Sequence, residues 1–162
     1  MNIFILHSQP EWAAIMHCDK HVVKMIVETA QLLSTALEQH QPEWFEPGSV
    51  YKPTHANHPC AVWVRETWAN YMWTWRLLVA LCKEYTFRYK KTHATARHID
   101  ALCVPSQAVA PSRITQPAQA MPEKYKRPKK PVAAYRAYYI GDKARIATWK
   151  NRQAPEWWPY EV

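Results

Sequence analysis

The stretch EWAAIMHCDKHVVKMIVETAQLLSTAL, residues 11–37, decides the fold class of this 162-residue chain. Its apolar residues recur every three or four positions, which places them within an arc of about 120° on a helical projection. They are Trp12, Ile15, Met16, Val22, Val23, Ile26, Ala30, Leu33 and Leu37. The pattern predicts one long amphipathic helix packed against a core. Ser8 to Glu11 fits a capping box that would begin this helix.

A second helix is predicted after a proline-containing loop. Asn57-His58-Pro59 precedes another stretch with apolar residues at helical spacing. We expect this helix to run from about Cys60 to about Tyr89, with Asn57 as its N-cap. The hydrophobic run 3–6, ahead of the first helix, fits either a short strand or a packed arm.

The last third of the chain contains the third predicted helix. Pro131 is a suitable first residue for a helix over residues 132–149, in which Gly141 is expected to weaken the middle. Six prolines between residues 98 and 131 exclude long helices there and predict a long Pro-rich loop. The expected fold class is all-α, a compact single domain of residues 1–162 with three main helices and this loop.

The charge of the chain is concentrated near its end. The net charge is +8, and residues 123–162 carry 10 Lys and Arg against 4 Asp and Glu. The chain also has 9 Trp and 9 Tyr. A basic, aromatic segment of this kind favours a nucleic-acid partner, with a solubilising surface as the alternative.

Other classes of protein are excluded by composition. Two glycines cannot build a P-loop or a dinucleotide fingerprint, and no apolar run reaches the roughly 18–20 residues of a membrane span. The amino terminus lacks a signal-peptide pattern, and four cysteines without C-x-x-C spacing indicate reduced thiols. We expect a cytoplasmic protein with no membrane partner and no cofactor.

The polar side of the first helix carries the candidate catalytic residues. Five side chains and Gln31 project within an arc of about 80°, opposite the apolar face. The five are His17, Lys20, His21, Lys24 and Glu28. Clustered cations favour a partly neutral lysine, a histidine can transfer protons near neutral pH, and a carboxylate can hold the lysine or act as a base. A solvated face without chemistry is the alternative.

Two further groups are candidates for nucleic-acid or substrate binding. Rings that stack on bases beside cations that hold phosphates are typical of nucleic-acid surfaces. The group before the second helix comprises Lys52, His55, Asn57, His58 and Arg65. The carboxyl-terminal group comprises Tyr125, Lys126, Arg136, Tyr139, Lys143, Arg152 and Trp157. Asp19 falls within the apolar face, so we expect it to be structural and paired with an arginine such as Arg65.

The histidines offer an alternative chemistry. His17 and His21, at i and i+4, would form a four-histidine metal site if the fold brought them to His55 and His58. Two lysines on the same face would repel a dication, and the glutamate of an H-E-x-x-H motif is missing. We therefore expect no metal.

Several pieces of the sequence resemble the small pyrimidine-dimer DNA glycosylase family of phages and bacteria. Residues 3–25 resemble its start, with the hydrophobic arm, the Leu-His-Ser junction and the pattern Ala-Ile-Met-x-x-x-Lys-x-x-x-Lys. Tyr51-Lys52 with Asn57-His58-Pro59 is similar to its Tyr-Lys-Asn-His-Pro element. Residues 71–89 resemble the end of its second long helix, and residues 155–160 its Pro-x-Trp-Tyr ending near the damaged base. Residues 17–25 are also similar to an uncharacterised phage protein group.

The resemblance implies a three-helix protein that binds duplex DNA, flips a base and attacks the sugar with its amino-terminal amine. An α-amine, with an ordinary pKa near 8, is a good nucleophile for imine formation. A glutamate on the first helix then assists strand cleavage. His21 occupies the position that matches this glutamate, and Lys20 and Lys24 match family arginines. Because Asn2 is a bulky second residue, we expect Met1 to remain.

These observations favour a DNA-acting protein of dimer-glycosylase-like architecture. Its expected reaction is base excision with lyase-type cleavage, or the processing of a modified base, in DNA repair or modification. One alternative is a nucleotide or metal-assisted hydrolase that uses the histidine cluster. The other is a non-catalytic nucleic-acid-binding phage factor. The expected partner is DNA or a nucleotide, in the cytoplasm of an infected host cell if the chain is phage-encoded.

Overall fold

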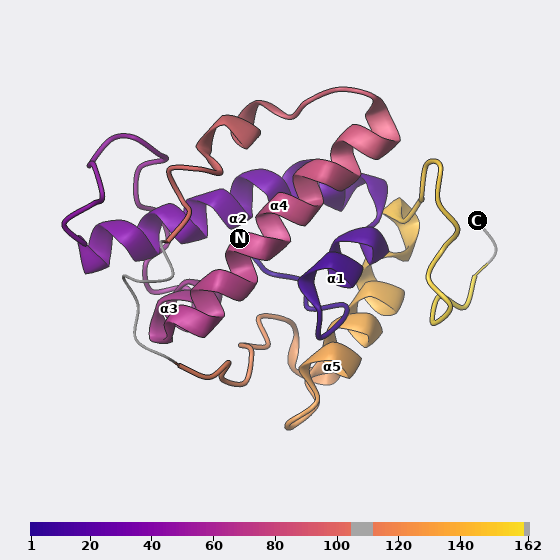
Figure 1. Ribbon diagram of the computed structural model, residues 1–162. Coiled ribbons are helices and arrows are strands. Elements are labelled where there is room, and N and C mark those ends of the chain that lie inside the picture. The colour runs from indigo at the N-terminus through magenta and orange to yellow at the C-terminus, as the bar shows by residue number, and fades with distance from the viewer. Residues whose placement is uncertain (105–111, 161–162) are drawn as a thin grey trace.

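Two helices of 22 residues, α2 (Asp19–His40) and α4 (Trp68–Tyr89), pack against each other and organise the molecule (Figure 1). The computed structural model describes residues 1–104 and 112–160. Shorter helices, α1 (Pro10–Met16) and α3 (Pro59–Glu66), pack beside α4, and α5 (Pro131–Tyr138) follows the long loop. The described residues contain no strand, so the all-α prediction is confirmed.

The predicted first helix is interrupted at His17 and Cys18, both of which have extended backbone angles. Tertiary hydrogen bonds replace the lost helical ones: the Cys18 N–H donates to the Tyr139 hydroxyl at 3.2 Å, and the Asp19 N–H donates to the Thr148 carbonyl at 2.8 Å. The apolar spacing continues across this break, which is why the sequence predicts one helix where the structure has two.

The second predicted helix is also divided in two. Thr67 has an extended conformation, and its hydroxyl accepts the Asn70 N–H at 3.1 Å, which caps α4. Two predicted caps are wrong. Gln9 rather than Ser8 is the N-cap of α1, with no side-chain bond, and His58 rather than Asn57 is the N-cap of α3. A cap needs a side chain aimed at free N–H groups, and this depends on the incoming loop.

The third predicted helix is regular only as α5. The chain continues as a π turn, Tyr139–Lys143, and a 3₁₀ turn, Ala144–Ile146. A Cβ atom on Gly141 would collide with the Tyr125 side chain, so glycine allows this ring to pack on the π turn. The expected weakness at Gly141 therefore coincides with the change of helix type.

The hydrophobic run Ile3 to Leu6 is a buried arm without strand pairing. The Phe4 ring stacks on His21 with 4.4 Å between centroids, and the Arg136 Nε donates to the Leu6 carbonyl at 2.9 Å. The arm thus joins α2 to α5. Figure 1 shows the amino terminus near the centre of the view and the yellow segment that leads to residue 160 at one side of it.

Four buried or partly buried charged side chains fasten the carboxyl-terminal segment to the helices, and we call them the interior charge cluster: Asp19, Glu84, Arg88 and Arg152. Arg88 donates to Glu84 at 2.7 Å and to Asp19 at 2.9 Å, while Arg152 donates to both Glu84 oxygens at 2.8 and 2.9 Å. Asp19 is therefore structural, as expected, but its partner is Arg88. Arg65 instead donates to the Ala56 carbonyl.

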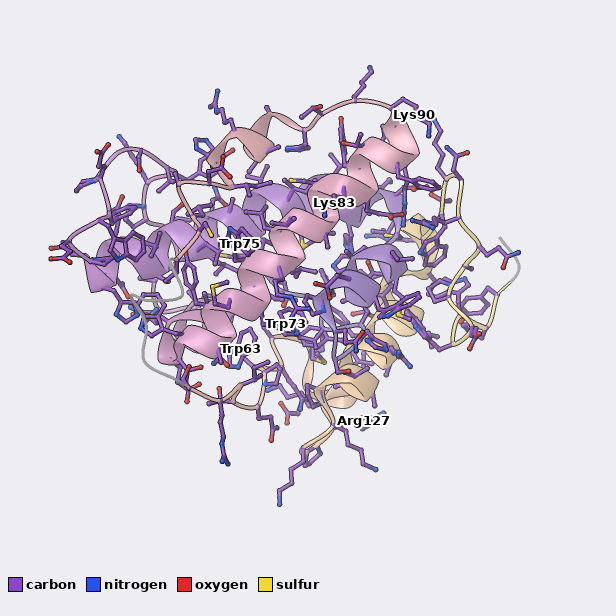
Figure 2. All side chains as sticks on the ribbon, in the orientation of Figure 1. Trp63, Trp73, Trp75, Lys83, Lys90 and Arg127 are labelled. Atoms are coloured by element: carbon purple, nitrogen blue, oxygen red, sulfur yellow. The ribbon has the colours of Figure 1, made fainter. Side chains whose placement is uncertain are left out.

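The aromatic residues divide between the core and the surface. Trp63 on α3 and Trp73 on α4, labelled in Figure 2, are buried in edge-to-face contact with 6.0 Å between centroids. Trp12 and Tyr160, by contrast, are more than half exposed. The cationic side chain of Arg127 also projects outward, from the loop before α5 (Figure 2). Within residues 1–104 and 112–160 no helix is long and apolar enough to cross a membrane.

Candidate active site at the amino terminus

The carboxylate of Glu28 lies beside the amino terminus of the chain. Its Oε2 accepts a hydrogen bond from the Asn2 backbone N–H at 2.9 Å and lies 3.7 Å from the α-amine of Met1. Its Oε1 lies 3.4 Å from Nζ of Lys24, one turn earlier on α2. One carboxylate therefore contacts two primary amines from different parts of the chain.

These groups differ in their access to solvent. The Met1 side chain is 3% exposed and packs against the core, whereas the residue as a whole is half-buried, so its exposed part is the main-chain end. The Glu28 side chain is 13% exposed and that of Lys24 is 68% exposed. Lys20, one turn before Lys24, is also exposed. A shielded carboxylate thus faces amines that a large ligand can reach.

His58 belongs to the same site. Its Nδ1 accepts the Cys60 N–H at 3.2 Å, which leaves the ring proton of the neutral form on Nε2. Burial lowers the pKa of His58, the Met1 amine and His55 lower it further, and Glu28 opposes them. We call Met1, Asn2, Lys24, Glu28 and His58 the amino-terminal site.

The other predicted residues before the second helix differ in their exposure and contacts. Lys52, His55 and Asn57 are exposed on the loop that leads to α3. His55 has a left-handed φ of 51°, and its Nδ1 lies 2.6 Å from the Thr54 hydroxyl. Arg65 is half-buried and holds the loop through the Ala56 carbonyl, so its guanidinium has a structural partner.

The prediction that His17 and His21 lie on an exposed face is wrong. His17 is fully buried in the break between α1 and α2, with Nδ1 2.6 Å from the Ala13 carbonyl. His21 is buried under Phe4, with Nδ1 2.6 Å from the Tyr139 hydroxyl. Burial lowers the pKa of His17 to about 4 and that of His21 to about 3, the latter helped by the neighbouring cations. Both rings are neutral at pH 7.

The four histidines do not meet, as a metal site would require. Among residues 1–104 and 112–160, which include all four, no three His, Cys, Asp or Glu side chains are grouped as metal ligands. His17 and His21 lie in the interior beside Phe4, whereas His55 and His58 lie on the loop and cap before α3. The hydrolase hypothesis based on this cluster therefore loses its geometric basis.

A cavity of about 630 Å³ opens between α1, α5 and the carboxyl-terminal segment, and we call it the tryptophan pocket. Its walls include Trp12, Met16, Arg136 and Trp157. The Arg136 guanidinium lies 5.4 Å from the centroid of the Trp157 ring, and the Trp12 side chain is 52% exposed. Two of the predicted carboxyl-terminal residues, Arg136 and Trp157, are thus brought together.

The remaining predicted carboxyl-terminal residues have different environments. Tyr139 is fully buried against Cys18 and His21, so the prediction that it faces a ligand is wrong. Arg152 is occupied by Glu84. Tyr125 donates to Asp142 at 2.6 Å, Lys126 pairs with Glu123 at 2.8 Å, and Lys143 lies 4.6 Å from the centroid of the Tyr138 ring.

Comparison with known proteins identifies the family. A model of the pyrimidine dimer DNA glycosylase family matches residues 1–97, more than half of the chain. The chain belongs to this family and is a DNA glycosylase-like, DNA-acting protein. Neither curated proteins nor solved structures give a match to this chain. The matched part contains the amino-terminal site, whereas α5 and the tryptophan pocket's Arg136 and Trp157 lie beyond it.

The sequence did not identify three contributors to these sites. Trp12 is read as core by its spacing, although it lines the tryptophan pocket. Tyr135 and Cys60 contact the Oδ1 atom of Asn2, and no local sequence pattern connects these residues. Only the implied amino-terminal nucleophile pointed toward Met1, and only the spacing of Lys24 and Glu28 pointed toward the carboxylate.

Proposed function

We propose that this protein is a DNA glycosylase with lyase activity, which removes a damaged or modified pyrimidine and then cleaves the strand at the amino-terminal site. The observation that carries this proposal is the position of Glu28, 3.7 Å from the Met1 α-amine and 3.4 Å from the Lys24 ε-amine. Imine chemistry needs an amine nucleophile and a nearby group that moves protons. Both are present in a chain of the glycosylase family.

Of the two amines, we assign the nucleophile to Met1. As chemical classes, α-amines lose their proton near pH 8 and lysine ε-amines near pH 10.4. The exposed Lys24, with Lys20 one turn away, is better suited to hold a phosphate.

The proposed reaction needs only groups of the chain, the DNA and water. The amine lone pair attacks C1′ of the target nucleotide, and the glycosidic bond breaks with its electrons leaving on the base, which takes up a proton. The nitrogen of the new C–N bond loses a proton, its lone pair forms the C1′ imine, and the C1′–O4′ bond breaks with its electrons on O4′, which takes up a proton as the ring opens. Glu28 then accepts a proton from C2′, and the electrons released expel the 3′ phosphate. Water hydrolyses the imine and restores the amine.

Separate regions would hold the DNA. The basic segment 123–162 supplies exposed cations, among them Arg127. The tryptophan pocket combines two indole rings and a guanidinium, a composition that suits an unstacked base. Arg136 also bonds to the Leu6 carbonyl, so the pocket and the amino-terminal arm share a residue. A fully extended chain spans at most about 3.5 Å per residue, so the short arm from Leu6 to the amino-terminal amine keeps the tryptophan pocket and the amino-terminal site within a few nucleotides of each other on one DNA segment.

The test is covalent trapping with borohydride, which reduces the imine to a stable amine. The wild-type protein is incubated with ultraviolet-irradiated duplex DNA, with other modified duplexes and with a duplex that carries one abasic site. We expect a trapped adduct and strand cleavage from the wild type. Glu28→Gln should lower the rate of strand cleavage by about 10²–10⁴-fold, the range of general acid–base catalysis.

Glu38→Gln, on the same helix, is the matched control and should retain the wild-type rate. The absence of an adduct on every substrate would contradict the proposal. Salt-dependent DNA binding without any adduct would instead support a non-catalytic binding protein. An equal loss of the strand-cleavage rate in the Glu28 and Glu38 variants would contradict a catalytic role for Glu28.

A further inference from the structure

Asn2 is held by hydrogen bonds from three other parts of the chain. Its Nδ2 donates to the Ala120 carbonyl at 2.9 Å. Its Oδ1 accepts from the Ile3 N–H at 2.8 Å, lies 3.2 Å from the Tyr135 hydroxyl and accepts from the Cys60 thiol at 3.4 Å. One short polar side chain thus joins the arm to the long loop, α5 and α3.

The Cys60 thiol and the Tyr135 hydroxyl, which face Asn2 Oδ1, keep their protons at all physiological pH values. Burial raises the pKa of Cys60 to about 11 and holds the pKa of Tyr135 well above its ordinary value. The Tyr135 hydroxyl also lies 2.7 Å from the Ala118 carbonyl, so its single proton is shared between that oxygen and Asn2. The network is therefore insensitive to pH over the range in which an α-amine titrates.

The main chain of Asn2 connects this network to the reacting groups. Its N–H donates to Glu28 Oε2 at 2.9 Å, and the Met1 amine, one residue away, lies 3.7 Å from the same oxygen. Chain termini are ordinarily mobile unless they are held. Here the Met1 side chain packs against the core on one side of the amine, and the Asn2 side chain is fixed on the other.

We infer that Asn2 is a positioning residue, whose side-chain amide holds the amino-terminal amine beside Glu28 for attack on the DNA sugar. The inference rests on the proposed function. The side chain of Asn2 does not touch the reacting atoms, and its amide is used entirely within the protein. Its loss should therefore lower the rate of the covalent step and leave DNA binding unchanged. A misplacement of about 1 Å can lower a rate by about 100-fold.

The experiment measures single-turnover borohydride trapping on a duplex with one abasic site, over a range of protein concentrations. Asn2→Leu removes the amide, keeps a side chain of similar size and, as a bulky second residue, keeps Met1, which intact mass verifies. Asn70→Leu is the matched control. Asn70 is another buried amide, which donates to the Trp63 carbonyl and the Thr115 hydroxyl, both at 2.8 Å, and accepts the Thr115 N–H.

We expect Asn2→Leu to lower the trapping rate at saturation by about 10–100-fold without a change in the half-saturating concentration. Hydrogen exchange of peptide 1–6 should accelerate. Asn70→Leu should leave both quantities near the wild-type values below its unfolding temperature. If Asn2→Leu does not fold, Tyr135→Phe, which removes one contact with Oδ1, replaces it and should lower the saturating rate by a smaller factor.

Two results would overturn the inference. One is a wild-type saturating rate in the Asn2 variant. The other is an equal loss of rate in the Asn2 and Asn70 variants, which would indicate a general loss of stability. A wild-type protein that forms no adduct would contradict the proposed function itself, so failure of that proposal is distinguished from failure of the role of Asn2.

Discussion

The interior charge cluster and the amino-terminal site both use α2, and both pair carboxylates with cations, yet they differ in access. In the cluster, the Arg88 side chain is fully buried and the Glu84 side chain is 4% exposed, and two arginines share that carboxylate. In the amino-terminal site, Lys24 is 68% exposed and the end of the main chain reaches solvent. The cluster has no amine left for a ligand, whereas the site has two.

This difference teaches that residue types alone do not separate structure from chemistry. Buried ion pairs become costly when one partner is lost, because the other charge stays in a medium of low polarity. Exposed pairs contribute little to stability and stay available to a ligand. Substitutions in the cluster should therefore lower stability first, and substitutions of the solvent-accessible groups of the amino-terminal site should lower activity at nearly unchanged stability.

The largest expected effect on stability comes from the interior charge cluster. Arg88→Met removes the cation shared by Glu84 and Asp19, and should lower the free energy of unfolding by about 3–5 kcal/mol. The exposed pair Arg76–Glu11 is the control, and Arg76→Met should change the free energy of unfolding by less than about 1 kcal/mol. Urea unfolding measures both. Equal changes would mean that the cluster is no more important than a surface pair.

The buried histidines should make stability depend on pH. Both have folded pKa values below the ordinary 6.5, so the unfolded chain binds more protons and stability rises with pH between about 3 and 6.5. The stabilisation is complete above pH 6.5 and decreases as pH falls, by up to about 2.7 kcal/mol per pH unit where two protons are bound on unfolding.

This dependence can be checked by urea unfolding at several pH values. A variant with His17→Phe and His21→Phe should have a flatter profile between pH 4 and 6.5. His40→Gln, which replaces an exposed histidine, should retain the wild-type slope. If the double variant kept that slope as well, the buried histidines would not be its source.

Trp12 provides a smaller effect that concerns binding. If a base stacks in the tryptophan pocket, Trp12→Ala should weaken DNA binding by about 1–3 kcal/mol, the contribution of one base–aromatic contact. The side chain is half exposed, so stability should change little. Phe87→Ala, which removes an exposed ring at the far end of α4, should leave affinity near wild type. Fluorescence anisotropy measures both, and equal affinities for the two variants would exclude the pocket as a base site.

The smallest expected effect concerns phosphate contacts. Lys20→Gln should reduce the slope of log affinity against log salt by about one unit and weaken binding to all sequences alike. Glu38→Gln on the same helix should leave the slope unchanged. A sequence-dependent loss in the Lys20 variant would indicate a base contact instead.

The sequence predicted the helical fold because apolar spacing reports directly which helix face is buried. It did not predict the breaks at His17 and Thr67. These breaks depend on the hydrogen bond that the Cys18 N–H donates to the Tyr139 hydroxyl and on the cap formed by Thr67, and neither affects apolar spacing. The prolines between residues 98 and 131 predict a long loop because proline acts on the backbone locally, and residues 105–111 of that stretch lie outside the described residues.

The site was predicted only in part, for a related reason. Lys24 and Glu28 meet because they are one turn apart on α2, which spacing alone reveals. The contact between Glu28 and the amino terminus depends on the path of the arm, and the contact between Asn2 and Tyr135 spans 133 positions. His17 and His21 were misplaced because their spacing puts them on the polar face of a single predicted helix, whereas His17 lies in the break between α1 and α2, and the arm and Tyr139 cover His21.

The assignment of the Met1 amine as the nucleophile can be tested most directly by locating the borohydride adduct. Trypsin releases residues 1–20 as one peptide, because Lys20 is the first lysine or arginine of the chain, and the next peptide begins at His21. Mass spectrometry of the trapped wild-type complex should find the sugar adduct on the α-amine of peptide 1–20. An adduct at Lys24, on a longer peptide that begins at His21, or at Lys20, would contradict the account.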